Sequence, residues 1–118
     1  MKKSPLVEKS YLFAIKVVKL AYQIQSSKKE YILTKQFIRS GTAIAALISE
    51  GQYAQSQADF INKFSVSLKE ANETMFWINL LKDSEFIHIE EFKIIYFDLE
   101  EIIKMLTASI NTLKSKQK

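Results

Sequence analysis

The side chains in this sequence that could do chemistry are a few carboxylates, one histidine and many lysines. Glu70 and Glu73 fall on one face of a helical pattern, which they share with Trp77 and Lys63. Paired carboxylates at this spacing can bind a metal ion or work as acid and base. A solvated or salt-bridged face is the commoner role of such residues, and it is the role that we expect here.

A second acidic motif, Glu85-Phe86-Ile87-His88, matches the Glu-x-x-His spacing of ferritin-like di-metal bundles. Those sites need two such motifs and two further glutamates in one core, whereas this chain has a single histidine, in a joint between helical segments. It also has no cysteine, no Gly-rich phosphate loop and no nucleophile elbow. We therefore predict no metal or other cofactor, and a protein that is not an enzyme.

Cations concentrate in the first third of the chain, since residues 1–39 contain nine basic residues and only two acidic ones. Sixteen of the seventeen cations are lysine, which favours diffuse attraction to phosphates over bidentate reading of bases. The candidate nucleic-acid-binding residues are Lys16, Lys19, Lys28, Lys29, Lys35 and Arg39. Two alternatives remain open: a merely solvated face, and a basic half that meets the acidic half of a second subunit.

Small side chains dominate the stretch from Arg39 to Gly51. Arg39 and Glu50 are eleven residues apart and point nearly the same way on a helix, with small residues between them. A matching strip of small residues, Ser67, Ala71 and Thr74, lies in the next segment. This pattern predicts a closely packed seam in which Arg39 pairs with Glu70 or Glu73; the alternative is that Arg39 joins the lysines in a polyanion site.

The elements that must position these residues are long helices, because the chain has only two glycines and one proline. Apolar residues recur at spacings of three and four in four segments of about 20 to 25 residues. Short joints then favour an all-α, antiparallel up-down-up-down four-helix bundle, formed by residues 1–118 as one domain, with a frayed basic tail at 114–118. A coiled-coil dimer of helical hairpins would use the same residues. The longest apolar run, Ala43–Ile48, is far too short to span a membrane.

Helix boundaries and core positions follow from the same spacing. Ser4-Pro5 is a plausible start of the first helix, Gln25–Lys29 reads as a polar connection, and Ser56 to Asp59 reads as a weak capping box that opens the third helix. The predicted core positions are Leu6, Ser10, Phe13, Val17, Leu20 and Ile24; Leu33, Phe37, Gly41, Ile44 and Ile48; Phe60, Phe64, Ser67, Ala71, Thr74, Ile78 and Leu81; and Ile89, Phe92, Tyr96, Leu99, Ile103, Leu106, Ile110 and Leu113.

Further apolar residues lie beside these core positions, and they suggest self-association. They are Tyr11, Ile15 and Tyr22 in the first segment and Ile94, Phe97 and Met105 in the fourth. A small bundle cannot bury two apolar stripes per helix unless another subunit covers one of them. We therefore expect a homo-oligomer, the alternative being wide seams inside one bundle.

Several of these motifs together resemble one known family. They are Arg39 to Ile44, Glu50-Gly51, Ser56 with Asp59-Phe60, Leu68 to Thr74, and Trp77 with Leu80-Leu81. In this order and spacing the chain resembles the bacterial four-helix-bundle proteins first noticed as reading frames in intervening sequences of 23S ribosomal RNA genes, also called S23 ribosomal proteins.

The resemblance implies a homopentamer of bundles around a central channel. It also implies kinship with the accessory variability proteins of diversity-generating retroelements, which bind nucleic acid and a reverse transcriptase. Arg39, Ser40, Glu50, Glu70 and Glu73 match the family pattern and are expected to have structural or interface roles. Ala43 and Leu47 depart from it, since a serine and an asparagine are expected there.

The function that we predict is a cytoplasmic, non-enzymatic, pentameric protein that binds RNA or DNA through its lysine-rich surface, with no membrane partner. The cytoplasmic expectation follows because charged residues interrupt the region after Met1-Lys2-Lys3, where a signal sequence would be apolar. The alternative is a scaffold that docks a partner protein through its exposed aromatic residues and the acidic stretch from Glu90 to Glu101.

Overall fold

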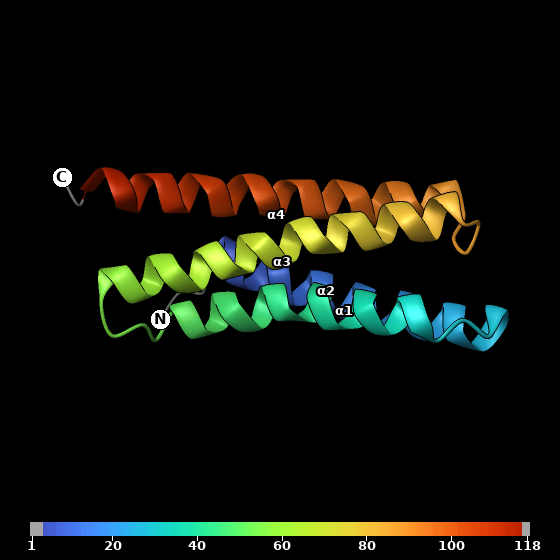
Figure 1. Ribbon diagram of the computed structural model, residues 1–118. Coiled ribbons are helices and arrows are strands. Elements are labelled where there is room, and N and C mark those ends of the chain that lie inside the picture. Colours follow the sequence, from blue (N-terminus) through green and yellow to red (C-terminus); the bar gives the residue numbers. More distant parts are fainter. Residues whose placement is uncertain (1–3, 117–118) are drawn as a thin grey trace.

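The computed structural model describes residues 4–116, which form four helices and no strand. These are α1 (Pro5–Lys28), α2 (Ile32–Gly51), α3 (Gln57–Asp83) and α4 (Ile89–Lys116). The chain turns back at each of the three connections, which gives an elongated bundle 50 Å long (Figure 1). The prediction of an all-α bundle of four helices is confirmed. No helix in this part of the chain is both long enough and apolar enough to cross a bilayer.

One hydrophobic core runs the length of the bundle. Each helix packs against the next along the chain, and α4 packs back against α1. Phe13, Phe37, Ile78 and Leu99, one from each helix, are almost completely buried. Since one amphipathic helix cannot bury its own apolar face, these contacts are what hold the helices in place.

The starts of α1 and α3 follow the sequence closely. Ser4 Oγ accepts a hydrogen bond from the Val7 N–H at 3.1 Å, and proline fills the first position of α1. Ser56 Oγ accepts from the Asp59 N–H at 3.0 Å, while Asp59 Oδ2 accepts from the Gln55 N–H at 3.3 Å. Both predicted helix starts are confirmed.

The predicted polar connection at Gln25–Lys29 is wrong, because α1 continues through Lys28. Lys29 ends the helix in the left-handed conformation, with φ of 56°, and its N–H donates to the Gln25 carbonyl oxygen at 3.1 Å. This bond satisfies a carbonyl that the helix end would otherwise leave free. Polar residues are tolerated in the last turns because that part of α1 is exposed on its outer side.

Glu30 caps the start of α2 from the other side of this connection. Its carboxylate accepts hydrogen bonds from the N–H groups of Ile32, Leu33 and Thr34, at 2.9 to 3.0 Å. Partial burial acts to raise the pKa of Glu30, but the hydrogen bonds to its charged form outweigh burial and lower the pKa below its ordinary value. Glu30 was not singled out from the sequence.

Most predicted core positions on the first three helices are buried, although Leu33 and Phe60 are only half-buried. On α4 two predictions are wrong by one residue, since Ile95 and Ile102 are buried while Tyr96 and Ile103 are half-buried. Ile89 is 48% exposed at the first position of its helix, where the prediction placed it in the core. Tyr96 and Ile103 each follow another apolar residue, so the spacing alone did not show which of the two faces the core. In the packed bundle, Ile95 and Ile102 are the buried ones.

The C-terminal basic segment is helical as far as the structure describes it. Lys114, Ser115 and Lys116 belong to α4, and Gln117 and Lys118 lie outside the described residues. The first part of the predicted tail therefore extends the helix.

Candidate interaction surfaces

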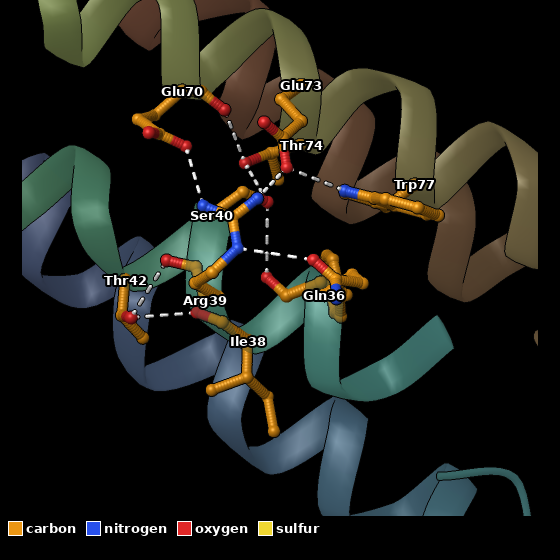
Figure 2. Close-up of polar contacts among 10 residues, drawn as sticks. Gln36, Ile38, Arg39, Ser40, Thr42, Glu70, Glu73, Thr74 and Trp77 are labelled. Carbon is orange, nitrogen blue, oxygen red and sulfur yellow. Dashed lines mark hydrogen bonds and ion pairs between the residues drawn. The ribbon is translucent and has the colours of Figure 1, made fainter. Parts of the chain in front are cut away.

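Arg39 joins α2 to α3 through a cluster of charged and polar side chains (Figure 2). Its Nη1 lies 3.3 Å from Glu70 Oε1, its Nη2 pairs with Glu73, and its Nε donates to Gln36 Oε1 at 3.2 Å. The Trp77 indole N–H donates to Glu73 Oε2 at 3.1 Å. The predicted pairing of Arg39 with Glu70 or Glu73 is thus confirmed, and it involves both carboxylates.

This cluster leaves Arg39 poorly suited to bind a phosphate. Its guanidinium is shared among two carboxylates and an amide oxygen, so a phosphate would have to displace charge-assisted hydrogen bonds. Gln36, which the sequence analysis missed, precedes Arg39 by three residues and so lies on the same face of the helix.

A buried seam of small residues lies beneath the Arg39 cluster. Thr74 Oγ1 is 2.9 Å from Ser40 Oγ and 2.8 Å from the Glu70 carbonyl oxygen, and Ser67 Oγ donates to the Ile44 carbonyl oxygen at 3.0 Å. Ser40, Ser67 and Thr74 are all fully buried. Such hydrogen bonds between helices require a close approach, which only small side chains allow.

Two glycines mark close approaches of α2 to its neighbours. A Cβ on Gly41 would lie 2.8 Å from Val17 Cγ1 of α1, and a Cβ on Gly51 would lie 2.7 Å from Phe64 Cε1 of α3. Both distances are shorter than van der Waals contact. At its far end the seam closes with an ion pair of 3.2 Å between Glu50 and Lys63.

The five residues that match the family pattern therefore gather along one feature, the seam between α2 and α3. They are Arg39, Ser40, Glu50, Glu70 and Glu73. Ala43 and Leu47, which depart from the pattern, are half-buried on α2. Between residues 4 and 116, no buried side-chain nitrogen or oxygen lacks a hydrogen-bond partner, so the packing accommodates these departures.

The candidate lysines do not form one surface. Lys16 pairs with Asp98 of α4, and Lys19 lies a turn further along α1. Lys28, Lys29 and Lys35 are exposed around the α1–α2 connection. Figure 1 places the α3–α4 connection at the same end of the bundle, and the residues in and beside it include Asp83, Glu85, Glu90 and Glu91. The fold thus brings the acidic segment to the same end of the bundle as the basic one.

Large apolar side chains are exposed on the outer sides of α1 and α4. Five of the six residues predicted to lie off the core are exposed, and only Met105 is half-buried against it; the five are Tyr11, Ile15, Tyr22, Ile94 and Phe97. A shallow apolar depression on α1 is lined by Tyr11, Ala14, Ile15, Val18 and the stem of Lys19. Two ion pairs, Lys9 with Glu101 and Lys16 with Asp98, cross between the helices.

Glu85 and His88 lie in the α3–α4 connection, in line with the sequence prediction. Glu85 adopts a positive φ of 65°, and the His88 N–H donates to Glu91 Oε1 at 3.2 Å. Within the described range 4–116, no three histidine or acidic side chains are grouped so that they could hold a metal ion.

The fold and the contacts described above define the class of protein. It is a small all-α protein in which four long helices enclose one core, and polar side chains link α2 to α3. The model of one family, the 23S rRNA-intervening sequence protein, matches residues 2–108. The chain therefore belongs to this family, which confirms the resemblance found in its motifs.

A solved structure agrees with this assignment. It is the crystal structure of a protein of unknown function from the S23 ribosomal protein family of Bacteroides thetaiotaomicron, 45% identical to this chain. The similarity covers 89% of this chain and 97% of that one, with a TM-score of 0.88. Among curated proteins, the comparison finds no match.

Proposed function

We propose that this chain is the non-catalytic subunit of a homo-oligomer, a pentamer of antiparallel bundles, that binds nucleic acid through its lysine-rich surface. The observation that carries the proposal is the apolar surface on α1 and α4. Phe97 and Tyr11 expose 59% and 64% of their surface there, although a monomer would gain from burying them. We take the partner that covers this surface to be a second copy of the chain, because other copies are present wherever the protein is made.

A ring is the assembly that this surface favours. The exposed residues belong to two helices whose charges differ, since α1 presents Lys19 while α4 presents Glu100. Contact between α1 of one subunit and α4 of the next would be heterologous, and heterologous contacts close into rings when the rotation allows. The choice of five subunits rests on the family resemblance.

Nucleic acid is the ligand that the charge favours. Each chain carries a net charge of +4, so five copies carry about +20. Lysines release counterions from phosphates without reading bases, and repeated weak contacts add up to retention that falls steeply with salt. The absence of cysteine fits a reducing cytoplasmic location, which is part of the proposal.

Light scattering on size-exclusion chromatography tests the assembly. A chain of 13.7 kDa gives about 68 kDa as a pentamer. The variant Phe97→Asp is expected to elute as a monomer, because it places a charge in the proposed interface. Phe76→Asp is the matched control: Phe76, on α3, is 59% exposed like Phe97 and lies outside the α1–α4 surface. A monomeric wild type, or equal effects of both variants, would refute the assembly.

Absorbance at 260 and 280 nm in the same experiment tests nucleic acid binding. We expect nucleic acid to co-elute with the protein at low salt and to separate at high salt. An oligomer that never retains nucleic acid would favour the alternative, a scaffold for another protein. In that case the exposed aromatic residues and the acidic stretch from Glu90 to Glu101 would be the docking surface. A partner that survives nuclease treatment of a pull-down would support the scaffold.

A further inference from the structure

We infer that each chain has two neighbouring copies, one docked on α1 and one on α4, an arrangement that rests on the proposed function and specifies which faces meet. The apolar residues on the outer sides of these helices form two separate surfaces. The α1 surface consists of Tyr11, Ile15 and Tyr22 with the half-buried Val18, and the α4 surface consists of Phe97 and Ile94. Phe97 of one copy docks into the shallow depression on α1 of the next.

The α1 surface is turned away from α4. Lys9 and Lys16 form ion pairs with two acidic residues of α4, so these lysines mark the side of α1 that faces α4. At about 100° per residue, every member of the α1 surface lies about 100° or more round the helix from both lysines. The α1 surface therefore points outward, on the side of α1 that is remote from α4.

Phe97 points outward from α4. Ile95 and Leu99, two residues before and two residues after it, are buried in the core. At about 100° per residue, both lie about 160° round the helix from Phe97. Because the α1 surface is on the far side of α1, one copy docked over Phe97 leaves the α1 surface exposed. Both surfaces are covered only when each chain has two neighbours.

The two surfaces have complementary shapes. The α1 surface is hollowed by the depression between Tyr11, Ile15 and Val18, whose floor includes the small side chain of Ala14. Phe97 exposes 59% of its surface on the outer side of α4. An aromatic ring that fills an apolar depression buries area on both copies, and such anchors dominate the energy of an interface.

Charge favours contact between unlike surfaces over contact between like ones. Lys19 borders the depression, and Glu100 lies one turn along α4 from Phe97. Neither forms an ion pair with any residue between 4 and 116. Two α1 surfaces in contact would gather two copies of Lys19, and two α4 surfaces would gather two copies of Glu100. Contact between an α1 surface and an α4 surface brings opposite charges together.

Cysteine cross-linking tests which faces meet, since the sequence has no cysteine of its own. Chains with Ile15→Cys and chains with Phe97→Cys are co-expressed, and a short bifunctional maleimide is added after light scattering has shown the wild-type mass. We expect covalent dimers on a denaturing gel from the mixture and none from either variant alone. Phe76→Cys replaces Phe97→Cys in the control mixture and is expected to give no dimer, because Phe76 is equally exposed but lies on α3. If Phe97→Cys lowers the mass, Glu100→Cys takes its place.

Charge reversal tests the same contact without changing its apolar residues. Lys19→Glu and Glu100→Lys are each expected to raise the concentration at which the assembly dissociates about threefold or more, and a chain with both is expected to lie within about twofold of wild type. Lys69→Glu is the control, since Lys69 is exposed on α3, and it is expected to leave the assembly unchanged.

Failure of the inferred contact is distinguishable from failure of the assembly. At the wild-type mass, any of three results overturns the contact and leaves the assembly standing: Ile15→Cys cross-links with itself, the mixture gives no more dimer than its control, or the two charge reversals together do not restore the assembly. A monomeric wild type overturns both.

Discussion

The seam between α2 and α3 and the surface where α1 meets α4 are built from different residues. Small side chains and two glycines draw α2 close to α1 and α3, and Ser40, Ser67 and Thr74 are fully buried with hydrogen-bond partners. Among residues 4–116, the polar contacts between α1 and α4 are two ion pairs near the surface. Leu12 and Ile94 remain half exposed or more beside them.

This difference separates two roles within one bundle. Side chains in the α2–α3 seam have all their partners inside the chain, so their substitution changes folding stability. Apolar side chains on α1 and α4 are incompletely covered by the chain itself, so they remain available to a partner. Arg39 and Glu73, charged residues that could have formed a binding site, instead stabilise the contact between α2 and α3. The side chains that remain exposed on α1 and α4 include large apolar ones.

The largest effect is expected from Gly41→Leu, which adds a side chain where α2 packs closely against α1. A Cβ there would lie 2.8 Å from Val17 Cγ1. We expect the free energy of unfolding to fall by about 2 to 3 kcal/mol, because overpacking outweighs the better helix propensity of leucine. Urea denaturation measures it. Ala14→Leu, in the shallow depression on α1, is the control and is expected to change stability little; equal losses would break the comparison.

The next effect concerns the buried hydrogen bonds of the seam. Thr74→Val keeps the shape of the side chain but removes the hydroxyl next to Ser40. Leaving Ser40 without this partner is expected to cost about 1 to 2 kcal/mol of unfolding free energy. Thr107→Val is a close control, since Thr107 makes the same hydroxyl bond to the carbonyl four residues before it, but on an exposed face of α4. A control that loses as much stability as Thr74→Val would contradict the assignment.

How far the sequence predicts this molecule depends on whether a residue acts within its own helix or across two. The helix starts at Ser4 and Ser56 depend on neighbours three residues away, so their pattern was sufficient. Arg39 and Glu73 could be paired because their spacing placed them on facing helices of a simple bundle. Buried Thr34, by contrast, is polar, and its hydrogen bond to Gln25 of the preceding helix leaves no periodic signal.

The lysines show a second limit of prediction from the sequence. A count along the chain makes residues 1–39 the basic region, but the potential at a surface depends on charges that are distant in sequence and close in space. Lys16 meets Asp98, 82 residues later, and the lysines of the α1–α2 connection lie at the acidic end of α3 and α4.

A double-mutant cycle on Arg39 and Glu73 sharpens the comparison further. The single variants Arg39→Ala and Glu73→Ala and their combination give the coupling between the two side chains. We expect about 1 kcal/mol, since Arg39 contacts two carboxylates at once but is itself half exposed. Urea denaturation at low and high salt measures it, and the coupling is expected to fall with salt. A coupling near zero would mean that the ion pair of Arg39 and Glu73 does not contribute to the stability of the seam.

Glu30 offers a test on the α1–α2 connection that depends on pH. Since its pKa is lowered in the folded protein, its charged form stabilises the fold above about pH 4.5, and this contribution is lost as the pH falls through the folded pKa. At pH 7, Glu30→Gln is expected to lose about 0.5 to 1 kcal/mol, as for other capping residues. The difference from wild type should be smaller at pH 3, where more of the carboxyl group is protonated. If denaturation gives the same difference at both pH values, the charge of Glu30 is not what caps α2.

The smallest effect is expected where α1 meets α4, and it completes the comparison. Lys16 and Asp98 form an ion pair in which the lysine side chain is 48% exposed. Because water and salt screen such a pair, the coupling from the cycle of Lys16→Ala and Asp98→Ala should stay below about 0.5 kcal/mol in the monomeric Phe97→Asp background. A coupling as large as that of Arg39 and Glu73 would mean that α1 and α4 are held by charge within one chain. The division between a stabilising seam and an associating surface would then fail.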